Sequence, residues 1–192
     1  MKAGAKLAVF CSGYGSNFEA ILGAIEKKQL DASVAVMVCD NPKAHALKRA
    51  SRRGIPVCLV SPRFFKKRSD YEKFLVRVLK SQKIDLVVLA GFMRIFTPYF
   101  VRAFRGKMLN IHPSYLPAFK GAHAIRDVYE SGAWSTGVTV HWVTEAVDAG
   151  PALLQTKVKI LKTDTLAKLE ARIHAVEHVL YPRAIQKLIH QR

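Results

Sequence analysis

Hydrophobic residues along this chain gather in short runs that polar segments separate. Seven runs rich in β-branched residues begin near positions 7, 34, 56, 86, 108, 137 and 153. Between the first five runs, apolar residues recur at the helical spacing of three and four, as at Phe18, Ile21, Leu22 and Ile25 and again over 74–79. Strands that alternate with helices are typical of an α/β domain with a parallel sheet, and we predict this fold class.

The end of the chain carries a longer helical pattern. The residues from Thr165 onward predict one amphipathic helix, with Asp164 as its expected cap and Pro182 as the expected site of a kink or break. Its apolar stripe consists of Leu166, Leu169, Ile173, Val176 and Leu180.

The composition is that of a globular protein. The 192 residues are 50% hydrophobic and 23% charged, without a linker-like break, which favours a single domain over 1–192. The apolar runs are too short to cross a bilayer, and we expect no signal peptide. Cysteines at 11, 39 and 58 are too widely spaced for a zinc knuckle and indicate a reducing, cytoplasmic setting. Only Cys11, beside a glycine-rich turn, is a candidate for reactivity.

The formal net charge of +17 is the one unusual feature of the composition. It suits either a nucleic-acid-binding face or a basic surface that attracts small anions. Lysine and arginine gather at 48–53, 63–68 and 157–162, but aromatic residues do not alternate regularly with them as stacking platforms. We therefore favour the second interpretation and expect no nucleic-acid partner.

The segment CSGYGSNFEAIL at 11–22 joins the first predicted strand to the first predicted helix. Gly13 and Gly15 permit a tight turn, after which the N–H groups of Gly15, Ser16 and Asn17 would face an anion at the positive end of the helix. Phe18 replaces the third glycine of a dinucleotide fingerprint, and the ending of a Walker loop is absent. The segment favours phosphate binding; the alternative is a plain turn with Ser16 or Asn17 as helix cap.

Asn110 and His112 lie two residues apart in the strand-like stretch MLNIHP at 108–113. Because side chains alternate along a strand, both point to one face, and Pro113 favours an extended exit from the strand. Histidine can transfer protons near neutral pH, and an amide N–H can stabilise an oxyanion. The pair is therefore a candidate reactive site; the alternative is a histidine hydrogen-bonded at the end of a strand, on a wet edge of the sheet.

Asp148 precedes an Ala-Gly-Pro turn, where an aspartate is ordinarily a turn former. If that loop folds over His112, the carboxylate would favour the charged imidazolium and hold its orientation.

Two further segments are weaker signals. FMRIF at 92–96 ends a buried run, so Met93 and Ile95 would line an apolar slot and Arg94 would reach an anionic ligand or remain solvated. His174 and Glu177 are three apart on the last predicted helix and can share one face.

Together these segments resemble the phosphoribosylglycinamide formyltransferase family. The order and approximate separations match over nearly the whole chain for SGYGSNFEAI, LAGFMRIF, NIHPSYLPAFKGAHA, GVTVHWVTEAVDAGP and EHVLYP. Other 10-formyltetrahydrofolate enzymes share the third and fourth segments, whereas the GSN loop and the Glu-His before Leu-Tyr-Pro favour the glycinamide branch. The resemblance implies an α/β, Rossmann-like, open and mostly parallel twisted sheet flanked by helices, with a long C-terminal helix.

The resemblance also implies an activity and its residues. The family moves a formyl group from the co-substrate 10-formyltetrahydrofolate to the amine of glycinamide ribonucleotide in purine synthesis, and this chemistry needs no metal. The implied catalytic residues are Asn110, His112 and Asp148. The implied ribonucleotide site consists of Gly15, Ser16, Asn17, His174, Ala175, Val176 and Glu177. The implied folate site consists of Arg68, Met93, Arg94, Ile95, Phe96, Asn110, Thr144, Glu145, Ala146, Val147 and Asp148, with Arg63 or Lys67 as alternatives to Arg68.

The chemistry suits these residue types. Attack of an amine on a formyl carbon creates a negative oxygen, which Asn110 and a protonated His112 can stabilise, while Asp148 helps to move the proton. The phosphate and the folate glutamate tail are both anions, so the +17 charge would steer them. We expect small-molecule substrates, no membrane partner, and a monomer or homodimer.

Three alternatives remain open. A 10-formyltetrahydrofolate hydrolase would direct water to the same carbon, but its family carries a regulatory domain ahead of this region. A methionyl-tRNA formyltransferase would suit the basic charge, but its family adds a C-terminal barrel. A non-catalytic nucleotide- or RNA-binding module would have no use for Asn110, His112 and Asp148 together.

Overall fold

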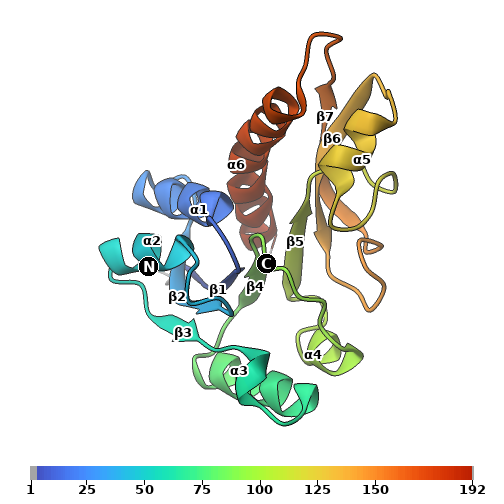
Figure 1. Ribbon diagram of the computed structural model, residues 1–192. Coiled ribbons are helices and arrows are strands. Elements are labelled where there is room, and N and C mark those ends of the chain that lie inside the picture. Colours follow the sequence, from blue (N-terminus) through green and yellow to red (C-terminus); the bar gives the residue numbers. More distant parts are fainter. Residues whose placement is uncertain (1–3, 192) are drawn as a thin grey trace.

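The computed structural model describes residues 4–191 and contains one seven-stranded sheet between layers of helices (Figure 1). The strands are β1 (Ala5–Cys11), β2 (Ala32–Cys39), β3 (Val57–Leu59), β4 (Leu86–Leu89), β5 (Met108–His112), β6 (Ser135–Trp142) and β7 (Ala152–Lys159). The helices are α1 (Ser16–Glu26), α2 (Ala46–Arg52), α3 (Arg68–Ser81), α4 (Pro98–Ala103), α5 (Ala124–Glu130) and α6 (Leu166–His190), with a short 3₁₀ helix η1 (Pro62–Phe64).

The strands lie in the order β3-β2-β1-β4-β5-β6-β7. The first five pair in parallel, and β6 and β7 add antiparallel pairs at one side. This confirms the mostly parallel α/β sheet. The direction of travel across the sheet reverses between β1 and β4, and ligands of such sheets bind outside the carboxyl ends of the strands at that point.

Two apolar cores lie on opposite faces of the sheet. Phe18 of α1 and Ile173 of α6 belong to one core, and Leu75 of α3 and Phe100 of α4 belong to the other. Figure 1 shows α3 and α4 on the side of the sheet opposite α1 and α6. The amphipathic spacing predicted for these segments therefore corresponds to helices that each bury one face.

Strand β5 divides its side chains between the two faces. Leu109 and Ile111 enter the core beneath α1 and α6, while Asn110 and His112 alternate to the other face. Because β5 pairs with both β4 and β6, it is an interior strand and not a wet edge. The strand ends at His112, directly before Pro113, as predicted.

Helix α6 begins one residue later than its predicted cap implies. Thr165 is the N-cap, and its hydroxyl accepts a hydrogen bond from the Lys168 N–H at 3.3 Å. Asp164 accepts instead from the Leu161 N–H and from both terminal nitrogens of the Arg172 guanidinium. The prediction of Asp164 as cap is wrong because its carboxylate binds the charged guanidinium of Arg172, a stronger partner than a backbone N–H.

The same helix continues through Pro182 to His190, so the predicted break there is wrong. Tyr181 and Ile185, on either side of the proline, are fully buried. The packing of these buried side chains stabilises the helix by more than is lost with the one backbone hydrogen bond that proline cannot make. Over residues 4–191, no helix has the length and apolar character needed to span a membrane.

Candidate active site

A cavity of about 690 Å³ opens at the carboxyl ends of β1, β4 and β5. Its walls come from the glycine loop (residues 12–17) after β1, the segment after β4, the loop after β6 and one turn of α6. The predicted site residues that line it are Gly15, Ser16, Asn17, Met93, Arg94, Ile95, Phe96, Asn110, His112, Thr144, Glu145, Ala146, Val147, Asp148, His174 and Glu177. Three others do not line it: Arg68, Ala175 and Val176.

Helix geometry explains why Ala175 and Val176 do not line the cavity. His174 and Glu177, three residues apart on α6, share the face that meets the cavity. Ala175 is exposed and Val176 packs against the apolar core, so neither contacts the cavity.

Arg68 lies at the first turn of α3. Its guanidinium donates to the carbonyl of Ile95 and pairs with Glu72 at 3.4 Å. It therefore supports the backbone of the segment after β4 rather than reaching into the cavity.

Arg94 lines the cavity with a charge that is already paired. Its Nε donates to Oδ2 of the buried Asp40 at 2.5 Å. The side chain is nevertheless 41% exposed, so a contact between Arg94 and an anionic ligand stays a prediction.

The glycine loop adopts a conformation that only glycine accommodates at Gly15. This residue has φ +74°, and an added Cβ would lie 2.8 Å from Cβ of Ala46. Among the described residues, no side chain caps the start of α1, so Ser16 and Asn17 are not caps. The first N–H groups of α1 are therefore available to an anion at the positive end of the helix.

Buried Glu177 joins α6 to the glycine loop. Its Oε2 accepts from Asn17 Nδ2 at 3.0 Å and from His174 Nδ1 at 2.9 Å. The hydrogen bond to Glu177 raises the pKa of His174 and outweighs the opposing effect of burial. Oδ1 of Asn17 is buried without a hydrogen-bond partner in the described chain, and it can accept from a ligand.

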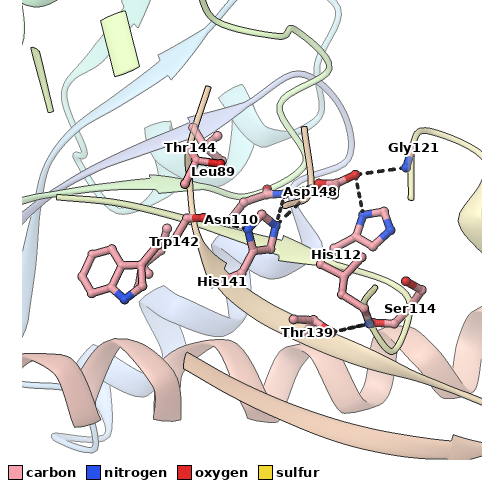
Figure 2. Close-up of polar contacts among 12 residues, drawn as sticks. Leu89, Asn110, His112, Ser114, Gly121, Thr139, His141, Trp142, Thr144 and Asp148 are labelled. Atoms are coloured by element: carbon pink, nitrogen blue, oxygen red, sulfur yellow. Dashed lines mark hydrogen bonds and ion pairs between the residues drawn. The ribbon is translucent and has the colours of Figure 1, made fainter. Parts of the chain in front are cut away.

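The loop that carries Asp148 folds over His112, which is the condition under which we predicted that the carboxylate would contact the imidazole. Asp148 Oδ2 lies 3.3 Å from His112 Nδ1 and accepts the Gly121 N–H at 3.0 Å, and Asp148 Oδ1 lies 3.5 Å from Asn110 Nδ2 (Figure 2). Burial opposes the charge of Asp148. Hydrogen bonds from His141 and Gly121 and the positive charge of both histidines outweigh it and lower the pKa of Asp148 to about 2.

His112 has an acceptor on each side of its ring. Nδ1 faces the Asp148 carboxylate, and Nε2 lies 2.8 Å from the carbonyl oxygen of Phe119. Only a ring that carries a proton on both nitrogens can donate to both. The arrangement thus suits a positive His112 beside the cavity, with both N–H groups engaged.

His141 is a neighbour of these groups that the sequence reasoning missed. It lies opposite Asn110 in the register of β5 and β6, and its Nε2 is 3.3 Å from Asn110 Nδ2 and 3.5 Å from Asp148 Oδ1. Its Nδ1 donates to the Trp142 carbonyl at 2.9 Å, so the ring is held with Nε2 toward Asn110 and Asp148. Strand alternation within GVTVHWV was the available signal.

Side chains of β6 and β7 hold the loop after β5 in place through hydrogen bonds to its backbone. Thr139 lies beside Ser114 (Figure 2), and its Oγ1 donates to the Ser114 carbonyl at 2.7 Å. Thr139 Oγ1 also accepts from the Leu116 N–H at 3.1 Å, and Gln155 Nε2 donates to the Leu116 carbonyl at 2.9 Å. These contacts hold the loop whose backbone reaches His112 and Asp148.

Two kinds of reactive group were also sought among the described residues, a cluster of metal ligands and an accessible thiol. Among residues 4–191, no three His, Cys, Asp or Glu side chains are grouped to hold a metal ion. Cys11 is fully buried, and burial raises the pKa of its thiol far above the usual range. Its candidacy as a reactive thiolate is therefore wrong.

Comparisons with known proteins agree with this architecture. Residues 5–185 match the formyl transferase family. The chain is 40% identical over 184 residues to the phosphoribosylglycinamide formyltransferase of Bacillus subtilis (strain 168), which is 96% of this chain and 94% of that protein. It is also 40% identical over 185 residues to the trifunctional purine biosynthetic protein adenosine-3 of Homo sapiens, and this match spans 96% of this chain but 18% of that protein.

Solved structures give the same result. Glycinamide ribonucleotide transformylase 1 from Symbiobacterium toebii has a TM-score of 0.96 at 38% identity, covering 100% of this chain and 91% of that chain. Phosphoribosylglycinamide formyltransferase from Bacillus halodurans has a TM-score of 0.93 at 43% identity, and the match covers 96% of this chain and 95% of that chain. With its family match, its relatives and its sheet all in agreement, this chain belongs to the formyl transferase family, in the phosphoribosylglycinamide formyltransferase branch.

Proposed function

We propose that this protein transfers the formyl group of 10-formyltetrahydrofolate to the amine of glycinamide ribonucleotide, giving formylglycinamide ribonucleotide and tetrahydrofolate in purine biosynthesis. One observation carries the proposal. The cavity holds an ionised Asp148 with His112, His141 and Asn110 around it, between a glycine loop at one end and an apolar wall at the other. A phosphorylated acceptor and a flat, largely apolar donor can therefore meet at the polar cluster.

The ribonucleotide end of the cavity consists of the glycine loop and the His174 turn of α6. The substrate phosphate lies against the N–H groups of Gly15, Ser16 and Asn17, where the helix dipole favours an anion. Glu177 and the unpartnered Asn17 Oδ1 offer acceptors to the N–H groups of the glycinamide. The raised pKa of His174 adds positive charge at the same end.

The folate end consists of residues 93–96 and 144–148. Met93 and Ile95 are 73% and 64% exposed and offer apolar surface to the ring system of the donor. The loop from Thr144 to Asp148 forms the facing wall and brings Asp148 to the reacting carbon.

The polar cluster supplies what the reaction needs. The amine nitrogen attacks the formyl carbon, the carbonyl electrons move to oxygen, and the bond to the folate nitrogen breaks as the carbonyl forms again. An N–H of Asn110 stabilises the oxyanion, an effect of roughly 3–4 kcal/mol per donor, and the positive charge of His112 acts through space. Asp148, through water, accepts the proton of the amine and returns it to the leaving nitrogen.

The proposal includes several finer features. The substrates are small molecules, the co-substrate is 10-formyltetrahydrofolate, no nucleic acid takes part, and the chain acts as one formyltransferase domain, as a monomer or homodimer. Three free cysteines suit the reducing cytoplasm in which we place it.

The deciding experiment compares the release of tetrahydrofolate from 10-formyltetrahydrofolate with and without glycinamide ribonucleotide, while the formylated product is followed by chromatography. We expect release that depends on the amine and equals the product formed. Release without the amine would replace this proposal with a hydrolase. If the protein binds these ligands without any turnover, and His112→Ala binds them equally well, the protein is a non-catalytic binding module instead.

A further inference from the structure

Helix α2 holds the glycine loop from a side that is not part of the cavity wall. The N–H of Ala46 donates to the Gly13 carbonyl at 3.2 Å, and Nε of Arg49 donates to the Tyr14 carbonyl at 3.1 Å. Neither Ala46 nor Arg49 lines the cavity. The helix therefore acts on the backbone of the loop and not on a ligand in front of it.

Arg49 is itself held in place by several contacts. Its NH1 donates to Glu19 Oε2 at 2.7 Å, and its guanidinium carbon lies 4.7 Å from the centroid of the Tyr14 ring. The same ring stacks on His45, with centroids 4.8 Å apart. The Arg49 side chain is only 13% exposed. A guanidinium this constrained keeps one orientation, since its planar fork fits the carboxylate and the carbonyl together.

This contact determines where the next N–H points. In a planar trans peptide, the C=O of one residue and the N–H of the following residue point in opposite directions. Because the Tyr14 carbonyl is directed to Arg49, the Gly15 N–H is directed away from Arg49. Gly15 lines the cavity, and its N–H is the first of the three donors in the proposed phosphate site.

We propose that Arg49 is a positioning residue for phosphate recognition, which fixes the Tyr14–Gly15 peptide so that the Gly15 N–H faces the phosphate. This inference rests on the proposed function, because it assumes that the substrate phosphate occupies the loop. A loop with two glycines loses much conformational freedom when it binds a ligand, and Arg49 removes part of that freedom before binding.

The test uses Arg49→Gln, Arg49→Lys and the matched control Arg53→Gln. Arg53 binds the same Glu19 carboxylate but has no described contact with the loop. Each variant is assayed with glycinamide ribonucleotide and with glycinamide riboside, which lacks the phosphate. For Arg49→Gln we expect a KM for the ribonucleotide about ten- to a hundredfold higher, with kcat, the KM for 10-formyltetrahydrofolate and the KM for the riboside unchanged.

The lysine variant separates charge from geometry. Lysine keeps the positive charge but cannot serve Glu19 and the Tyr14 carbonyl with a planar fork, so we expect its KM for the ribonucleotide to stay raised. A KM equal to that of the wild type in Arg49→Lys would overturn the inference, and so would equal losses for ribonucleotide and riboside in Arg49→Gln. If Arg49→Gln does not fold, as judged by thermal unfolding, the lysine variant decides alone.

A second measurement keeps this inference separate from the proposed function. Calorimetric binding of inorganic phosphate to the wild type and to Arg49→Lys requires no turnover. Weaker phosphate binding by the variant supports the positioning role even if the wild type fails to formylate glycinamide ribonucleotide. Equal phosphate binding by the two proteins would refute it even if the transferase activity is present.

Discussion

The two ends of the cavity are built on different physical principles. At the ribonucleotide end, buried Glu177 binds Asn17 and His174, and α2 binds the carbonyls of the glycine loop. At the folate end, large apolar side chains are exposed, with Met93 and Ile95 as the clearest cases.

Arg94 and Glu145, two charged groups of the folate end, are each paired with a neighbouring side chain. Arg94 binds Asp40, and Arg102 binds Glu145 at 2.7 Å. One end thus recognises its ligand through the fixed direction of polar groups, and the other through apolar area that becomes buried on binding. Changes at the first end act through geometry, whereas changes at the second act through surface area.

The largest effect is expected between the two ends, where Asp148→Asn removes the charge that both histidines face. We expect kcat to fall about a thousandfold, because the proton of the amine loses its acceptor and His112 loses its carboxylate partner. The KM values of both substrates should change little. Asp127→Asn, at an exposed position on α5, is the control. Unchanged kcat in Asp148→Asn would remove this residue from the mechanism.

Gly15→Ala tests the ribonucleotide end alone. The φ of +74° and the 2.8 Å approach to Ala46 force the loop to move. We expect a loss of about 1–3 kcal/mol in the free energy of unfolding and a KM for the ribonucleotide raised about tenfold or more. Gly23→Ala is the matched control, since no described atom lies within 4 Å of its added Cβ. Equal ribonucleotide KM values in the two variants would show that the loop shape is unimportant.

Replacement of both Met93 and Ile95 by serine tests the folate end. We expect a KM for 10-formyltetrahydrofolate raised about tenfold or more, because less apolar area is buried on binding. Thermal stability and the KM for the ribonucleotide should be unaffected, because both side chains are exposed before binding. Trp134→Ser, which removes another exposed side chain outside the cavity wall, is the control. A normal folate KM in the double variant would contradict the assignment of this wall.

The smallest effect is a pH dependence confined to the ribonucleotide end. The hydrogen bond to Glu177 raises the pKa of His174 above its ordinary value of 6.5, although burial opposes it. The favourable charge is therefore fully present below pH 6.5 and is lost as the pH rises through the raised pKa. We expect the KM for the ribonucleotide to rise a few-fold as the pH increases above the pKa of His174.

The substrate has titrating groups of its own, so the measurement is the difference between the wild type and His174→Gln. That difference should shrink as the pH rises, while the folate KM of the two proteins stays equal. A difference that does not depend on pH would exclude His174 as a source of the charge.

Much of this architecture could be predicted from the sequence because its signals are local. Alternation along β5 is enough to place Asn110 and His112 on one face, and the glycine-rich turn before α1 is visible as a motif. The position of His141 opposite Asn110 needed only the additional step of pairing two strands.

Other features depend on contacts between distant segments. The pairing of Arg94 with Asp40 joins residues 54 positions apart, and no local pattern indicates it. Asp164 and Thr165 are both suitable helix caps, and only the position of Arg172 decides between them. The closure of Asp148 over His112 was likewise predicted only as a condition, because it depends on how the loop after β6 packs.

The strand order has a consequence for how this protein family can change. The ribonucleotide end comes from the loop after β1 and from α6, whereas the folate end comes from the loops after β4 and β6. Within residues 4–191 the two ends come mainly from different segments, which meet where the Ser12 hydroxyl accepts from the Met93 N–H at 3.0 Å. β5, β6 and Asp148 carry the polar cluster between the two ends. Mutations that alter the formyl acceptor therefore need not disturb the donor, and selection can act on the two specificities separately.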